Sequence, residues 1–167
     1  MPELTRDWIG SSGAEIGGRL EREIEALVAV SSPSGDVDGA EEAIAVACAL
    51  LPAQAKVERP PCSSPGHAAD LCARLAGRGE RRVLLLGHLD TVVAHAEHRP
   101  LERDGAKLVG SGAIDMKGGV AIALGALRAL AGVPEAYAEA ALLLVVDEEW
   151  RTGGFGHGPA FAGWDGC

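Results

Sequence analysis

The sequence is poor in basic charge and in aromatic residues, and it has no long apolar run. It carries 15 Lys and Arg residues against 24 Asp and Glu residues, a formal net charge of −9. Neither half has a basic face, so we expect no nucleic-acid partner. The richest apolar stretch, Val120 to Val133, is interrupted by Arg128 and falls short of the roughly 18 residues that a bilayer span requires. We therefore expect no membrane partner either.

Paired cysteines and a secretory leader are also missing. The four cysteines, Cys48, Cys62, Cys72 and Cys167, form no C-x-x-C pair, which argues against a zinc ribbon. The first ten residues, MPELTRDWIG, have no basic segment followed by an apolar one. Two disulfides are conceivable in a secreted protein, but scattered thiols without a leader are more typical of a reducing compartment. We therefore predict a cytoplasmic protein.

The composition is that of a folded domain. The chain of 167 residues is 47% hydrophobic, which fits one domain and excludes a disordered acidic tail. Apolar periodicity and capping signals predict two helices, over 13–30 and 41–51, and a third over 116–131. Strands are predicted over 56–59, 69–75, 83–86 and 141–146, with a long loop over 90–111.

A strand–helix–strand unit over residues 83–146 is the most informative of these patterns. Its two strands are wholly apolar, as in strands buried on both faces, and the crossover helix makes them parallel. The predicted fold is therefore α/β, with a mostly parallel sheet flanked by helices. In such sheets ligands bind beyond the carboxyl ends of the strands. This rule singles out three segments, GHLD (87–90), GAID (112–115) and DEE (147–149).

These segments carry the residue types of a metal site. An imidazole from His88 and carboxylates from Asp115, Glu148 and Glu149 suit zinc, cobalt or manganese. Asp90, two residues after His88, is placed to accept the other imidazole N–H. Asp115 precedes a helix and can bridge two cations. Since Glu148 and Glu149 are adjacent, one can bind metal while the other stays free as a general base.

Simpler interpretations stand beside this one. Asp115 can be an ordinary helix cap, and the acidic segment from Asp147 can be a solvated turn. A nucleotide-binding loop at 110–112 is disfavoured, because Asp115 stands where the third glycine of the pattern belongs. Lys117 is followed by Gly118 and not by Ser or Thr, so it does not mark a phosphate-binding loop.

Three segments, LLLGHLDTV (84–92), GSGAIDMKGG (110–119) and VVDEEW (145–150), together resemble a known family in their letters, order and spacing. It is the co-catalytic zinc peptidase and deacylase family that includes glutamate carboxypeptidase, acetylornithine deacetylase, succinyl-diaminopimelate desuccinylase and aminoacylase. The resemblance covers most of the chain. It implies a zinc-exopeptidase-like catalytic domain and a metal-dependent hydrolase of amide or peptide bonds.

The resemblance also implies a role for each candidate residue. His88 would bind one metal ion, Asp115 would bridge two, and Glu149 would bind the other. Glu148 would be the general base and Asp90 would support His88. The ions would be two Zn²⁺, with cobalt or manganese as alternatives. The substrate would be a small peptide or an N-acyl amino acid, attacked by metal-activated water.

Members of the family are more than twice this length, and the resemblance implies parts that residues 1–167 do not include. These are a lid domain and a C-terminal catalytic segment. In the family the lid supplies most dimer contacts, so the resemblance leaves open whether the full-length protein is a homodimer. AGWDGC (162–167) resembles the entry to the next strand of the family fold. We therefore expect 1–167 to be the N-terminal part of a catalytic domain.

In the family, each metal takes a third ligand from that later segment. Within residues 1–167 each metal ion would keep two ligands. These are His88 and Asp115 for one ion, and Asp115 and Glu149 for the other. Asp165 and His157 are the remaining candidates for a substitute ligand. The alternative hypothesis is therefore a catalytically silent chain that binds metal weakly or serves as an interaction module.

Overall fold

The computed structural model describes residues 5–167; residues 1–4, the start of the segment searched for a leader, lie outside the described residues. The α-helices are α1 (Arg6–Val28), α2 (Val37–Ala49) and α3 (Gly118–Ala131). The strands are β1 (Lys56–Glu58), β2 (Leu71–Ala76), β3 (Arg82–His88), β4 (Glu102–Asp104), β5 (Lys107–Val109) and β6 (Glu139–Val145). Within the described residues, no helix is both long enough and apolar enough to cross a membrane.

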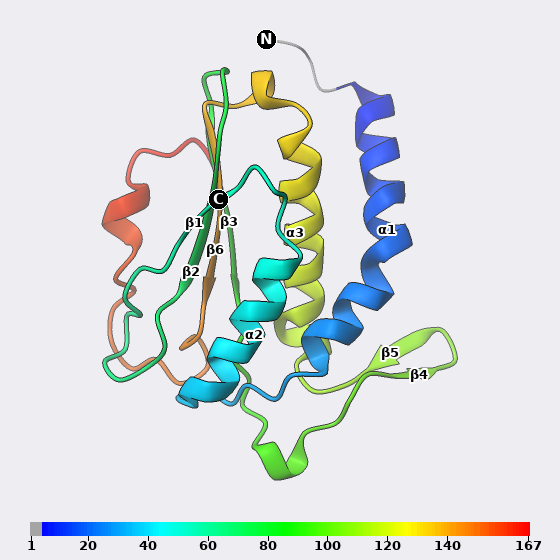
Figure 1. Cartoon of the computed structure of the whole chain (residues 1–167), viewed down its shortest axis with the longest axis vertical. Coiled ribbons are helices and arrows are strands. Elements are labelled where there is room, and N and C mark those ends of the chain that lie inside the picture. The colour runs from blue at the N-terminus through cyan, green and yellow to red at the C-terminus, as the bar shows by residue number, and fades with distance from the viewer. Residues whose placement is uncertain (1–4) are drawn as a thin grey trace.

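The α/β fold is confirmed, with four strands in the order β1-β2-β6-β3 (Figure 1). The βαβ unit is also confirmed, since β3 and β6 pair in parallel through the crossover that contains α3. The expectation of a mostly parallel sheet is wrong, because β1–β2 and β2–β6 are antiparallel. The segment 77–81 between β2 and β3 is too short for a crossover connection, so it reverses the chain direction and makes β2 and β3 antiparallel. β6 lies between these two strands in the sheet.

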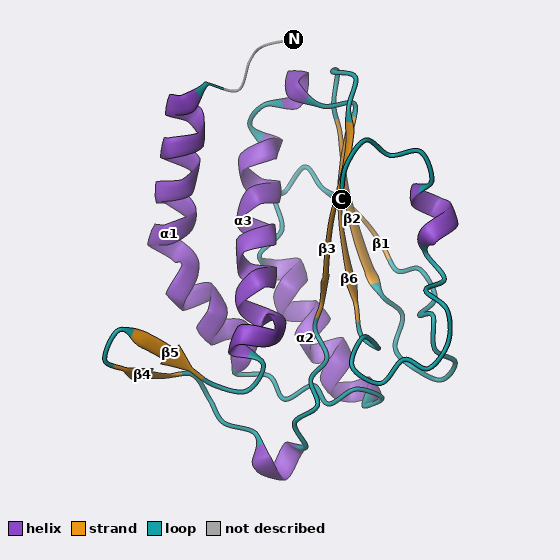
Figure 2. Ribbon diagram, turned by 180° about the vertical axis from the view of Figure 1, so that it is seen from behind, coloured by secondary structure: helices purple, strands orange, loops and turns teal. Residues whose placement is uncertain are grey.

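The three α-helices all lie on one face of the sheet (Figure 2). Along β6, Ala140, Leu142 and Leu144 pack into the main core on that side. The alternate residues Leu143 and Val145 face the other side, where Phe161 and Trp164 pack against a smaller cluster. The second face is therefore covered by the C-terminal segment, with one short helix at Gly158–Phe161, and not by an α-helix.

The C-terminal residues also run along the outer edge of β3. The Asp165 amide donates to the Arg82 carbonyl at 2.9 Å, and the Leu84 amide donates to the Gly166 carbonyl at 2.9 Å. This bridge is parallel. That AGWDGC enters a further strand stays a prediction, as does the assignment of 1–167 to part of a larger domain.

Two helices begin earlier than the sequence predicted, because their caps lie further upstream. Thr5 caps α1 by accepting a hydrogen bond from the Trp8 amide at 3.2 Å. Asp36 caps α2 in the same way, with its Oδ2 2.6 Å from the Gly39 amide. The segment 90–111, predicted as a loop, contains the β4–β5 hairpin, whose turn places Gly105 at a φ of 59°. These strands are short and exposed, so they leave no apolar pattern.

Arg128, which interrupts the apolar face of α3, has a partner on α1. Its guanidinium contacts both carboxylate oxygens of Glu23, at 2.8 and 2.7 Å, and also donates to the Leu50 carbonyl. The Glu23 side chain is 4% exposed.

Lys117 makes a second polar link, since its fully buried ammonium donates to the Val30 carbonyl at 2.6 Å. Burial lowers the pKa of Lys117 to about 8.

We predict that Arg128→Leu lowers the free energy of unfolding by about 3–5 kcal/mol, because it leaves the buried Glu23 carboxylate without its counter-charge. Urea unfolding followed by circular dichroism measures the change. Arg22→Leu, on the exposed side of α1, is the control and shifts stability by about 0.5 kcal/mol or less. Equal losses in the two variants would show that the Glu23–Arg128 pair contributes nothing specific.

Candidate metal centre

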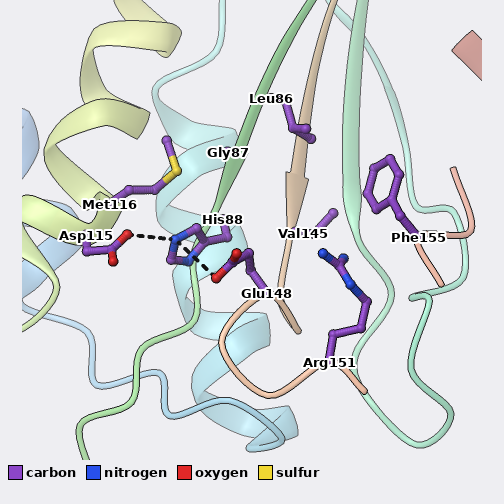
Figure 3. A pocket seen from close by; sticks show the side chains of 9 residues that line it. All are labelled: Leu86, Gly87, His88, Asp115, Met116, Val145, Glu148, Arg151 and Phe155. Atoms are coloured by element: carbon purple, nitrogen blue, oxygen red, sulfur yellow. Dashed lines mark hydrogen bonds and ion pairs between the residues drawn. The ribbon is translucent and has the colours of Figure 1, made fainter. Parts of the chain in front are cut away.

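The three polar segments meet at one edge of the sheet. His88 is the last residue of β3, and Glu148 and Glu149 follow the end of β6. Because β3 and β6 are parallel neighbours, their carboxyl ends lie side by side. Asp115 comes from the turn Ala113–Lys117 that leads into α3, and Figure 3 shows it beside His88. The three segments that the strand-end rule singled out therefore lie together, and their role as a metal site stays a prediction.

Three side chains form a compact donor set. His88, Asp115 and Glu149 each offer a ligand atom, and these atoms lie within 4.8 Å of one another. His88 Nε2 is 3.1 Å from Asp115 Oδ1. One imidazole nitrogen with carboxylate oxygens is a donor set that zinc accepts. The residues present thus fit a metal ion, and they are the three that were predicted as ligands.

Asp115 occupies this position as part of a tight turn and does not cap α3. The structure gives α3 no side-chain cap, and the Asp115 carboxylate points to His88 instead. The Asp115–Met116 peptide is cis. Gly112, at a φ of 70°, lets this turn approach the loop after β3, since a Cβ there would come within 2.7 Å of the Thr91 methyl group.

Asp90 connects the ends of the two strands. Its side chain is 1% exposed, and Oδ1 lies 3.3 Å from His88 Nδ1. The Glu148 amide donates to Oδ1 at 3.2 Å and the Glu149 amide donates to Oδ2 at 3.1 Å. Burial opposes ionisation of Asp90, but the hydrogen bonds from His88 and from the Glu149 amide outweigh it, so the pKa of Asp90 lies below its usual value.

His88 is held between carboxylates on both sides. Burial of the ring opposes its charged form, yet the hydrogen bond and charge of Asp90, together with Asp115, raise the pKa of His88 to about 9. Without metal the raised pKa therefore favours the imidazolium at neutral pH, with a proton on each ring nitrogen. The Nε2 proton must leave when a cation binds there, so metal binding releases protons.

The adjacent glutamates differ in their surroundings. Glu149 belongs to the donor set, and burial raises the pKa of its carboxyl group above the usual value. Glu148 has a side chain 48% exposed, with Oε2 3.9 Å from His88 Nε2, and it lines a cavity next to the donor set (Figure 3). The division of the pair into a ligand and a free base stays a prediction.

A second group of buried polar residues, which the sequence did not reveal, supports the loop after β6. Asp70, fully buried, accepts hydrogen bonds from the Val146 amide at 3.1 Å and from His157 Nε2 at 2.7 Å. Asp147 accepts from the Ser64 hydroxyl at 2.7 Å. The only signal in the sequence was an aspartate at the start of an apolar strand, with its partner 87 residues away.

Neither candidate for an additional ligand lies in the donor set. His157 is engaged by Asp70. Asp165 lies at the other end of β3, where it accepts from the Arg82 amide at 2.8 Å and from the Arg81 guanidinium at 3.0 Å. Among the described residues, the donors brought together are therefore one imidazole and two ligating carboxylates.

An imidazole and two carboxylates that meet at the carboxyl edge of an α/β sheet form a donor set suited to a metal ion. Residues 84–165 match Peptidase family M20/M25/M40, so this stretch of the chain is similar to members of that family. Carboxypeptidase G2 from Pseudomonas sp. (strain RS-16) is 32% identical over 142 residues, which are 80% of this chain and 32% of the relative.

Solved structures share the fold. Human carnosine dipeptidase 1 superposes with a TM-score of 0.67 and 21% identity over 83% of this chain and 34% of the other. An M20 family metallo-carboxypeptidase from Sulfolobus solfataricus, Sso-CP2, gives 0.62 and 21% over 78% of this chain and 31% of the other. The chain thus spans about a third of the length of these relatives.

We predict that Asp90→Asn lowers the free energy of unfolding by about 2 kcal/mol, because the amide NH₂ faces a hydrogen-bond donor where a carboxylate oxygen accepted one. The same substitution weakens zinc binding about 10–100-fold, since it disturbs the orientation of His88. Urea unfolding and zinc titration measure the two effects. Asp104→Asn, on exposed β4, makes the same chemical change away from the site and leaves both quantities unaltered. An Asp90 variant indistinguishable from this control would contradict the role given to Asp90.

Proposed function

We propose that the protein is a metal-dependent hydrolase of amide or peptide bonds, of the carboxypeptidase or N-acyl-amino-acid deacylase type. The observation that carries the proposal is the donor set of His88, Asp115 and Glu149, with Glu148 free beside it. The match of residues 84–165 to the peptidase family and the likeness to Carboxypeptidase G2 support it. The substrate is a small peptide or an N-acyl amino acid.

The residues divide between two ions. His88 and Asp115 would hold one, and Asp115 and Glu149 would hold the other. Zinc is the metal that we propose, with cobalt or manganese accepted by the same donors. When bound, such ions supply Lewis acidity, which polarises the scissile carbonyl and lowers the pKa of water.

Glu148 moves the proton in this proposal. Its carboxylate is half exposed on the cavity beside His88, so it can reach both water and substrate. It takes a proton from the attacking water and gives it to the amide nitrogen as the carbon–nitrogen bond breaks. Asp90 holds His88 through Nδ1, which directs Nε2 to the face occupied by Asp115.

We predict that Glu148→Gln in the full-length, zinc-loaded protein lowers kcat for amide hydrolysis at least about 100-fold, because the amide cannot accept the proton of water. Zinc affinity stays within about threefold of the wild type, since Glu148 is outside the donor set. Glu80→Gln, in the exposed turn before β3, is the matched control. Activity within tenfold of the wild type would show that Glu148 is not the base.

A specific observation favours a second candidate function. The described residues give each ion of a two-metal site only two ligands, which fits a catalytically silent chain that binds metal weakly or acts as an interaction module. Zinc titration of the full-length protein distinguishes the two. Tight binding of two ions with turnover supports the hydrolase, and weak binding without turnover supports the silent chain.

Location and partners complete the proposal. The four cysteines are free thiols, as a reducing cytoplasm favours. We propose no nucleic-acid or membrane partner, in keeping with the acidic charge, and a homodimer of the full-length protein remains compatible with the fold.

A further inference from the structure

The loop that carries Glu148 and Glu149 has little regular structure of its own. It runs from Val146, just after β6, to His157, and it consists of turns and bends. The stretch TGGFG (152–156) makes it rich in glycine, so its backbone has much conformational freedom to lose on ordering. A metal ligand and a base on such a loop need contacts from outside the loop to keep them in position.

One buried carboxylate, that of Asp70, contacts both ends of this loop. Its Oδ1 accepts a hydrogen bond from the Val146 amide at 3.1 Å, and its Oδ2 accepts one from His157 Nε2 at 2.7 Å. The backbone of Asp70 is itself fixed, since its amide donates to the Pro60 carbonyl at 2.9 Å and its carbonyl accepts from Arg59 Nε at 3.1 Å. The two ends of the loop therefore cannot separate unless a bond to Asp70 breaks.

His157 makes the contact that closes the loop. The residue is 9% exposed, and its ring lies edge-on against Phe155, with the ring centroids 5.4 Å apart. Burial raises the pKa of Asp70, and the hydrogen bond from His157 opposes that rise. His157 thus favours the ionised carboxylate, which is the stronger acceptor for the Val146 amide.

The Val146 amide is the start of the segment that supplies the metal centre. Two residues further on, the Glu148 and Glu149 amides donate to Asp90 at 3.2 and 3.1 Å. Two buried carboxylates, Asp70 and Asp90, therefore hold three of the four backbone amides of 146–149. Loss of the contact at Asp70 would leave this segment held by Asp90 alone.

We propose that His157 is a positioning residue of the metal centre, which acts through Asp70 and the Val146 amide on the orientation of Glu148 and Glu149. The proposal rests on the proposed function for the roles of Glu149 as a ligand and Glu148 as the base. His157 lies outside the donor set itself, so its effect is exerted through the loop.

Two amide side chains of different reach separate this role from a contribution to packing. His157→Gln places its amide nitrogen where the imidazole Nε2 lies, so it can still donate to Asp70. His157→Asn carries its amide nitrogen closer to the backbone, at the level of Nδ1, and falls short of Asp70. Phe161→Ala removes packing of the same C-terminal segment against the sheet, and it is the control for a loss of stability.

Zinc affinity of the full-length protein is the first measurement, with zinc alone as the probe. We expect His157→Asn to bind zinc about 5–10-fold more weakly than the wild type, since it acts on the ligands only through the backbone. His157→Gln and Phe161→Ala are expected to stay within about twofold. Equal affinities of the Asn and Gln variants would overturn the proposal, whether both match the wild type or both are weakened.

Amide hydrogen exchange of the metal-free protein is the second measurement, and it separates this proposal from the proposed function. We expect the amides of 146–149 to exchange at least about tenfold faster in His157→Asn, and within about twofold of the wild type in His157→Gln. If the zinc-loaded protein cleaves no amide, the proposed function fails, while faster exchange and weaker zinc binding in His157→Asn still support the positioning role. Unchanged exchange in His157→Asn would overturn that role, whatever the protein hydrolyses.

Discussion

The geometry of the candidate metal centre depends on the contacts of the buried Asp90 carboxylate. This carboxylate is buried just beyond β3 and accepts hydrogen bonds from the backbone amides of Glu148 and Glu149. Its Oδ1 lies 3.3 Å from His88 Nδ1, which also lies 3.1 Å from the Asp90 backbone carbonyl, its hydrogen-bond acceptor. Since β3 and β6 are parallel neighbours, one carboxylate can reach the ends of both. It orients the imidazole by its side-chain contact and the two glutamates by their backbone. Ligand geometry and loop conformation are therefore set by the same group.

Other buried carboxylates hold the same loop from the opposite side. Asp70, at the entrance to β2, binds the Val146 amide and His157, while Asp147 binds Ser64 and Arg151. The segment that carries Glu148 and Glu149 is thereby tied to three separate parts of the chain. Burying carboxylates costs desolvation energy, which these hydrogen bonds offset. The result is a preorganised loop with one guanidinium held toward the cavity.

The sequence was informative where local pattern and topology decide the structure. The apolar strands around residues 83–86 and 141–146 predicted the parallel pair, and the strand-end rule then gathered His88, Asp115 and Glu149. It was uninformative where the partner is distant. Glu23 and Arg128 are 105 residues apart, and nothing near Arg128 indicates that its charge is satisfied. The direction of β2 depends on β6 inserting beside it, which no local signal encodes.

Anomalous diffraction at the zinc absorption edge, from crystals grown with zinc, tests the central claim most directly. The account predicts two anomalous peaks at the carboxyl edge of β3 and β6, one between His88 and Asp115 and one between Asp115 and Glu149. Each lies about 2.0–2.2 Å from its donor atoms. Zinc bound only elsewhere on the molecule, with no peak at His88 and Asp115, would contradict the account.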